Sequence, residues 1–201
     1  MKIFLQKGCD CLTGKSHIAT GVVTVGFVAD SMFLIKNTES PVFLQTAVDN
    51  TLNYVFDNGR ISFWLYVLLA VLLYILGILL PDIDHPYSMI GKIIHLPIQH
   101  RTWTHAIWLV LIFGLLSIPY RLCIFVGVGM FVHDFWDSFS RTGNRWFYPL
   151  DDEFVKKHHK LKLYYTGQSS EYIVVGILIA LLLVYTFFVF QHVFQFVNIS
   201  L

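Results

Sequence analysis

Residues 61–80 are apolar from end to end and carry no charged side chain. A run of about 20 such residues is what an α-helix needs to cross a bilayer. The run must be helical because backbone hydrogen bonds inside lipid have to be satisfied within the segment. Further apolar stretches cover residues 17–35, 104–119, 122–137 and 171–197. Together they predict an all-α, polytopic membrane helical bundle with about five transmembrane helices.

The composition fits one membrane-embedded domain over residues 1–201. The chain is 56% hydrophobic and only 13% charged, whereas about a quarter of the residues in a soluble domain are charged. Between the first two apolar runs, residues 36–60 predict a surface helix that closes at Asn58–Gly59. The net charge of +1 gives no basic field for nucleic acid, which is therefore not an expected partner.

The distribution of basic residues predicts the orientation in the membrane. Five crossings would place the N-terminus, the 81–103 loop and the 138–170 loop on one face. The basic residues of that face are Lys2, Lys7, Lys15, Lys92, Arg101, Arg141, Arg145, Lys156, Lys157, Lys160 and Lys162. The opposite face has Lys36, Arg60 and Arg121. Because basic residues accumulate in cytoplasmic loops, we expect a multi-pass protein with its N-terminus and these loops in the cytoplasm.

Histidines and aspartates gather at the same predicted level, at the cytoplasmic ends of the helices. The candidate metal ligands are His17, Asp82, Asp84, His85, His100, His105, His133 and Asp137. Unpaired charge at the edge of lipid is costly, so a bound cation is the simplest explanation. Histidine with carboxylate suits Zn²⁺, Mn²⁺ or Fe, and we expect Zn²⁺ first. Eight candidates exceed the four ligands of one zinc ion, so two or more ions are expected.

The pair formed by His133 and Asp137 has helical spacing. Residues four apart share one face of a helix, so this pair can bind one ion, or the carboxylate can orient the histidine. Asp134 points to another part of the same helix, and we predict that it is solvated or caps the helix.

The aspartates after the second apolar run lie in a turn. Pro81 is expected to end the helix, and Asp82 and Asp84 then face the same way in an extended segment. Two carboxylates placed in this way repel each other unless a cation lies between them. His85 precedes a proline, which keeps it extended; it either binds the ion or braces the turn.

The third predicted helix begins beside two histidines. His100 and His105 are five residues apart and converge only if His100 lies in the preceding loop, with Thr102 or Thr104 as the N-cap. Arg101 either binds a phosphate or carboxylate through two hydrogen bonds or anchors the chain at the membrane interface.

The remaining cysteines and histidines singled out here are not expected to bind a metal. Cys9 and Cys11 are expected to be free cytosolic thiols, since two ligands do not make a tetrahedral site. His158 and His159 belong to the basic run K-K-H-H-K, which is expected to contact anionic headgroups.

Several of these motifs together resemble the YdjM-like family, LexA-regulated proteins of the bacterial inner membrane described as metal-dependent hydrolases. The matching pieces are G-K-S-H, L-L-P-D-I-D-H-P-Y-S-M-I-G-K, H-R-T-W-T-H-A, H-D-F-W-D and T-G-N-R-W-F-Y-P. They cover residues 17–150, and the basic 138–170 loop and the 171–197 helix extend beyond them. The family pattern prefers glycine at Thr102 and serine at Ala106, and Asp134 is an extra acid. A looser similarity is to zinc-dependent phospholipases C, which use several zinc ions.

The resemblance implies a hydrolase, and we expect a phosphoesterase acting on a lipid or lipid-linked substrate. Asp84 or Asp137 would orient or deprotonate a metal-activated water. The expected substrate-binding residues are Arg101, Lys92, Arg141 and Arg145. Two alternatives are a non-catalytic, metal-stapled scaffold or assembly subunit, and a di-iron membrane oxidoreductase. The latter rests on H-R-T-W-T-H, which is similar to one histidine box of the desaturases, and the further boxes are missing.

Overall fold

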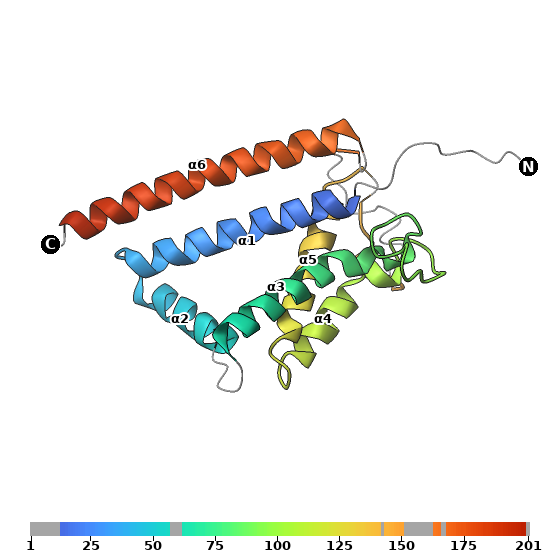
Figure 1. The fold of residues 1–201 in the computed structure, drawn as a ribbon, viewed down its shortest axis with the longest axis horizontal. Helices are drawn as coiled ribbons and strands as arrows, with labels where there is room; N and C mark the ends of the chain where they lie inside the picture. The colour runs from blue at the N-terminus through green and yellow to red at the C-terminus, as the bar shows by residue number, and fades with distance from the viewer. Residues whose placement is uncertain (1–12, 57–61, 142, 151–162, 166–167, 200–201) are drawn as a thin grey trace, which may run out of the picture.

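The computed structural model describes residues 13–56, 62–141, 143–150, 163–165 and 168–199, and these form an all-helical protein (Figure 1). Six α-helices and two short 3₁₀ helices follow in the order α1 Thr13–Asn37, α2 Val42–Phe56, α3 Phe63–Leu79, η1 Leu80–Asp84, η2 Trp103–His105, α4 Ile107–Leu116, α5 Cys123–Ser138 and α6 Ser169–Ile199. The predicted fold class is therefore confirmed. The predicted connector helix is α2, and its expected end at Asn58–Gly59 lies outside the described residues.

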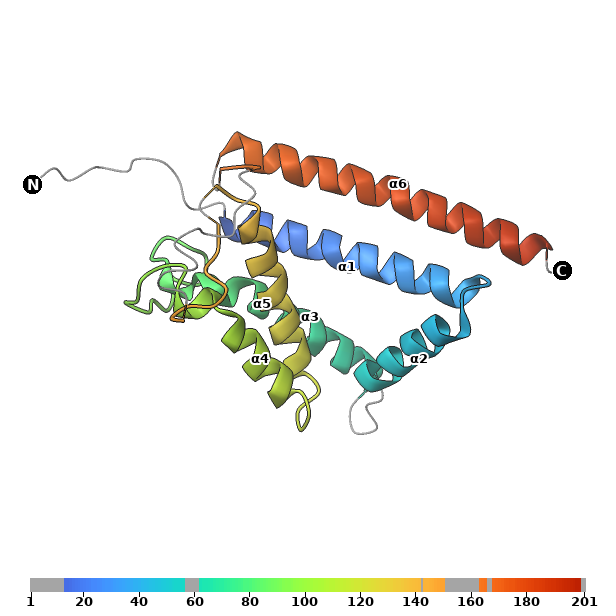
Figure 2. The same ribbon diagram turned by 180° about the vertical axis from the view of Figure 1, so that it is seen from behind.

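Helices α1 and α6 run side by side in the same direction, and α2 crosses the far end of the molecule (Figures 1 and 2). Polar pairs fix their parallel register along the contact. Near one end Ser16 donates a hydrogen bond to Glu171, and further along the Ser31 and Tyr185 hydroxyls lie 3.0 Å apart. The N-terminal ends of α1 and α6 thus lie at the same end of the protein.

Three described segments are long and apolar enough to cross a membrane: Gly14–Asn37, Phe63–Asp84 and Ser169–Gln195. The other two predicted crossings form a shorter hairpin. At 1.5 Å per residue, the 10 residues of α4 reach about 15 Å and the 16 residues of α5 about 24 Å. A bilayer core is about 30 Å thick. The number of five crossings thus remains a prediction.

Helices α3 and α5 approach so closely that their backbones touch. A Cβ atom added at Gly77 would lie 2.3 Å from the carbonyl oxygen of Val126, and one at Gly129 would lie 2.4 Å from that of Tyr74. Such close backbone contact at glycines is typical of tightly packed membrane helices. It brings the C-terminal half of α5 beside the end of α3, where the predicted ligands begin.

Two local predictions at the helix ends are wrong. The α-helix ends at Leu79, as expected from Pro81, but the chain continues as η1 to Asp84, so Asp82 and Asp84 lie in a 3₁₀ turn and not in the predicted extended segment. Proline is tolerated there since the first turn of a helix does not need its N–H group. Neither Thr102 nor Thr104 caps α4: its N-cap is Ala106, with an extended backbone. η2 precedes it as a separate turn, so the chain bends between His105 and α4.

The chain after α5 folds back over the same end of the bundle. The Leu163 amide donates to the Phe139 carbonyl, and the Arg141 amide donates to the Tyr164 carbonyl, each at 2.9 Å. The Ile107 amide donates to the carbonyl of Trp146, also at 2.9 Å. These bonds attach residues 139–141, 146 and 163–165 to the ends of α4 and α5, so they cover the region where the ligands meet.

Candidate metal centre

Four helix ends bring the predicted ligands together. His17 comes from the start of α1, Asp82 from η1, His105 from η2, and His133 from the last turns of α5. All four side chains are buried, and His105 and His133 are 0% and 1% exposed. Together with His100, they form two overlapping groups of ligand atoms that could each hold a metal ion: His17–Asp82–His133 and Asp82–His100–His105. Asp82 is common to both groups and so lies between two possible ion positions.

The spacing of these atoms fits ligands that share an ion. Nε2 of His133 and Nε2 of His105 lie 3.7 and 3.8 Å from Oδ1 of Asp82. Two ligands bound tetrahedrally at about 2.1 Å from zinc are about 3.4 Å apart. The observed distances are too long for hydrogen bonds and close to this separation. A small inward movement would therefore give coordination geometry.

His133 is oriented by the backbone of α3. Its Nδ1 lies 2.7 Å from the carbonyl oxygen of Ile78. A carbonyl only accepts, so Nδ1 carries a proton, and in the neutral ring Nε2 presents a lone pair to the centre. This Nε2 is buried and has no hydrogen-bond partner among the described residues. A histidine held through one nitrogen and open at the other is the usual arrangement of a metal ligand.

His105 is similarly prepared for coordination. Burial, with the nearby His133 imidazole, lowers the pKa of His105 well below its ordinary value, so the ring is neutral at pH 7. Its Nε2 is buried and unpartnered among the described residues. A neutral imidazole is the form that binds a metal. Burial thus favours the binding form of this residue.

Asp84 lies behind the histidines and orients them. Its Oδ1 accepts a hydrogen bond from Nδ1 of His100 at 2.6 Å, and its Oδ2 accepts one from the Thr104 hydroxyl. This fixes the tautomer of His100 and leaves its Nε2 for an ion. Both oxygens of Asp84 are engaged by neighbouring side chains in this arrangement, and its role as a direct ligand stays a prediction.

Asp137 joins the centre to Arg101. One guanidinium nitrogen of Arg101 lies 3.1 Å from Oδ2 of Asp137, and another donates to the Gly143 carbonyl at 2.8 Å. The other oxygen, Oδ1, lies 3.3 Å from Nε2 of His17. Arg101 has a left-handed backbone, with φ of 62°, and its side chain is 14% exposed. The Arg101 side chain thus points into the centre and pairs with Asp137. From the sequence we expected it to bind substrate.

The remaining predicted residues lie at the edge of the centre. The half-buried His85 ring packs against His100, with 4.9 Å between ring centroids. The Arg141 and Arg145 guanidinium groups lie over the Tyr165 and Tyr148 rings, at 4.4 and 4.6 Å from the centroids. Lys92 is exposed in the loop after η1. Cys9, Cys11, His158 and His159 lie outside the described residues.

Asp134 was assigned wrongly from the sequence. It is 0% exposed, whereas we predicted a solvated or capping residue. An oxygen of its carboxylate groups with His105 and His133 as a third set of possible ligands. The signal was present in the spacing: Asp134 is seven residues after Gly127 and therefore on the same helical face. That face packs on α4, with Gly127 against Phe113.

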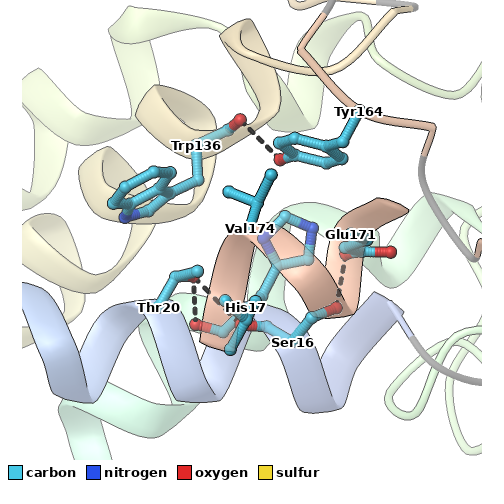
Figure 3. Close-up of a pocket in the computed structure, with 8 residues that line it drawn as sticks. Ser16, His17, Thr20, Trp136, Tyr164, Glu171 and Val174 are labelled. Atoms are coloured by element: carbon cyan, nitrogen blue, oxygen red, sulfur yellow. Dashed lines mark hydrogen bonds between the residues drawn. The ribbon is translucent and has the colours of Figure 1, made fainter. Parts of the chain in front are cut away.

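A polar wall next to His17 was also missed. Figure 3 shows the His17 ring close to Glu171 of α6 and to Tyr164, beside a cavity of about 10 Å³. That volume holds about one water molecule. Glu171 is 3% exposed and accepts a hydrogen bond from Ser16, while the Tyr164 hydroxyl donates to the Trp136 carbonyl at 2.7 Å. The last helix and residues 163–165 are therefore part of the surroundings of the centre.

A bound cation would balance the buried carboxylates of the centre. Asp82, Asp84, Asp134 and Asp137 are all buried, and Arg101 is the guanidinium that faces them. Oδ2 of Asp82 is buried without a hydrogen-bond partner among the described residues, like the Nε2 atoms of both central histidines. Buried carboxylates and lone pairs without partners are costly. The donor set of imidazole and carboxylate fits a divalent metal such as zinc, manganese or iron.

Comparisons with known proteins agree with the motifs. The model of a family described as YdjM inner membrane protein matches residues 12–196. This match extends past the predicted limit of residue 150 and includes α6 as far as residue 196. No curated protein and no solved structure matches the chain. Since the matched segment covers almost the whole sequence, the chain belongs to the YdjM inner membrane protein family.

Proposed function

We propose that the protein is a metal-dependent hydrolase of phosphoesters in the inner membrane, with its centre at the cytoplasmic leaflet. The observation that carries the proposal is the pair of imidazoles of His105 and His133, whose unpartnered nitrogens face the Asp82 carboxylate in a buried site. Such sites in hydrolases bind metals that activate water. A cation bound there would supply an acidic water and would stabilise negative charge on phosphoryl oxygens.

The residues around the ligands have distinct roles in this proposal. Asp137 is the general base that orients the attacking water and accepts its proton. Arg101 keeps Asp137 ionised and in place through the 3.1 Å ion pair. Asp84 and Thr104 fix the His100 ring. Arg101 acts through Asp137, so Lys92, Arg141 and Arg145 are the residues that bind the negative charge of the substrate, as expected from the sequence.

Substrate enters this site from the side of His100. The His100 side chain is 33% exposed, whereas His17, His105 and His133 are buried. His85 and the exposed Lys92 are on the same loop. A phosphoryl group arriving at this edge would reach the ion position formed by Asp82, His100 and His105.

An apolar cavity favours a lipid substrate. A cavity of about 360 Å³ lies between α4 and α5, lined by Val110, Leu111, Gly114, Leu115, Ile124, Gly127, Val128 and Phe131. One of its lining residues, Phe131, lies two residues before His133 in α5. A Cβ atom added at Gly114 would meet no atom within 4 Å, so this part of the cavity is open. An acyl chain could lie there while its phosphoester headgroup reaches the centre.

Charge supports the orientation. Among the described residues, Lys15, Lys92, Arg101, Arg141 and Arg145 lie at the end of the bundle that carries the centre, and Lys36 and Arg121 lie at the other end. The basic end faces the cytoplasm in most multi-pass membrane proteins.

Burial favours one alternative, a metal-stapled scaffold without catalysis. The central ligands are almost inaccessible, with His105, His133 and Asp137 at 0–1% exposure. A structural metal site is closed, whereas a catalytic site keeps an open position. The partly exposed His100 is the feature that separates the two, because it offers such a position.

Hydrolysis by purified protein tests the proposal. Detergent-solubilised protein, loaded with Zn²⁺ or Mn²⁺, is assayed on bis(p-nitrophenyl) phosphate and on phosphatidic acid in vesicles. We expect metal-dependent hydrolysis that His133→Ala abolishes and that His192→Ala, on the exposed surface of α6, leaves unchanged. Metal binding without hydrolysis of either substrate, together with loss of both metal and stability in His133→Ala, would favour the scaffold.

A further inference from the structure

Asp134 is a buried carboxylate that the catalytic proposal does not use. It is 0% exposed, and neither of its oxygens accepts a hydrogen bond of ordinary geometry from a described residue. The Asn144 amide is its neighbouring donor, but it donates its hydrogen bond, at 3.1 Å, to the His105 carbonyl. A carboxylate buried in this way is costly unless it is protonated or bound to a cation.

The surroundings of Asp134 favour a cation. The carboxylates that face it are those of Asp82 and Asp137, and the Arg101 guanidinium is already paired with Asp137 at 3.1 Å. One Asp134 oxygen and one ring nitrogen each from His105 and His133 all lie within 4.8 Å of one another. Two nitrogen ligands and one carboxylate oxygen are a common set for zinc.

We propose that Asp134 is a direct ligand of a divalent cation, at a position that it forms with His105 and His133. The proposal rests on the metal centre described above and adds a ligand to it. This position lies on the side of the centre that faces α4, because Asp134 continues the face of α5 that packs on that helix. This group lacks Asp82, which belongs to the other two groups of possible ligands. Because the one open nitrogen of His133 binds one ion at a time, Asp134 adds a ligand to an ion held by the central histidines, and the protein binds that ion more tightly than it would without this carboxylate.

Substitution by asparagine separates a ligand from a protonated acid. Asparagine has the shape of a protonated aspartic acid but lacks the charge that binds a cation. Zn²⁺ and Mn²⁺ binding is measured by equilibrium dialysis with elemental analysis, on wild type, Asp134→Asn and the control Asp30→Asn. Asp30 lies in α1 and accepts a hydrogen bond from Thr186 of α6, and it belongs to none of the ligand groups. We expect Asp134→Asn to bind the metal at least tenfold more weakly than wild type, and Asp30→Asn to match wild type.

Equal stoichiometry and affinity in wild type and Asp134→Asn would overturn the inference while leaving the proposed function intact. Wild-type protein that binds no metal would overturn both. If Asp134→Asn does not fold, Asp134→Cys loaded with Co²⁺ gives a second test. A thiolate ligand there produces sulfur-to-cobalt charge-transfer absorption beyond that of wild type, which has the same three native cysteines. Absence of that absorption in folded, cobalt-loaded protein contradicts the inference.

Discussion

Replacing Asp82 by asparagine should stabilise the metal-free protein and destabilise the metal-loaded one. The structure gives the reason for the first effect. The protonated Nδ1 of His133 donates to Ile78, so its Nε2 presents a lone pair to the Asp82 oxygen 3.7 Å away. Two hydrogen-bond acceptors that face each other form no hydrogen bond and so add no stability. An asparagine amide in the same place can donate to His133 after closing by several tenths of an ångström.

The size of each effect follows from typical values. A new hydrogen bond contributes about 0.5–1.5 kcal/mol, which raises Tm by about 1–6 °C for a domain of this size. Loss of a residue that only orients a ligand weakens metal binding by about 10–100-fold, so loss of the shared ligand itself should reach the upper end. That is about 2.7 kcal/mol. The metal-loaded variant should therefore be less stable than wild type by about 1–2 kcal/mol.

Thermal unfolding in detergent measures this change of sign. Tryptophan fluorescence is followed on wild type and Asp82→Asn, once with EDTA and once with saturating Zn²⁺. Asp30→Asn is the control for removing a membrane-embedded acid away from the centre, and its shift should be the same with and without zinc. If Asp82→Asn is destabilised equally in EDTA and zinc, Asp82 has a structural role only, and the account of the shared ligand is wrong.

Three further substitutions test other parts of the account. Gly129→Ala should destabilise the protein by about 1–3 kcal/mol, because its methyl group would lie 2.4 Å from a carbonyl oxygen of α3. Gly176→Ala, where the added methyl group meets no other atom, should change the stability little. Chemical unfolding of the two variants compares these effects. Thr104→Val should weaken zinc binding by about 10–100-fold in dialysis, and unchanged affinity would contradict the orienting role of its hydroxyl. Gly114→Leu should lower kcat/KM for long-chain lipid phosphoesters but not for bis(p-nitrophenyl) phosphate, with Gly176→Leu as control; an unaffected lipid rate would exclude the cavity as the acyl site.

Much of the fold could be predicted because lipid leaves few options for an apolar chain. The run at 61–80 became α3, Phe63–Leu79, and that at 122–137 became α5, Cys123–Ser138. The sequence could not predict the details at helix ends. Pro81 continues into η1 because a 3₁₀ turn tolerates it, and α4 is short because the chain bends at Ala106. Both depend on contacts with other helices.

The sequence could predict which residues come together in the candidate site, but not the role of each residue there. The position of His17, Asp82, His105 and His133 at helix ends on one side followed from counting apolar runs. The role of each acid depends on which side chain its oxygens reach. Asp84 contacts His100 and Thr104, and Asp134 is buried because its helical face packs on α4. Neither contact has a local signature in the sequence beyond the spacing from Gly127.

X-ray absorption at the K edge of bound metal tests the central claim most directly. Protein loaded with zinc should show a shell of nitrogen and oxygen ligands at about 2.0–2.2 Å, with the outer scattering of imidazole rings. Asp82→Asn should reduce or alter that shell. Sulfur ligands at about 2.3 Å would instead place the ion on the cysteines, and protein that retains no metal would contradict the existence of the His/Asp centre.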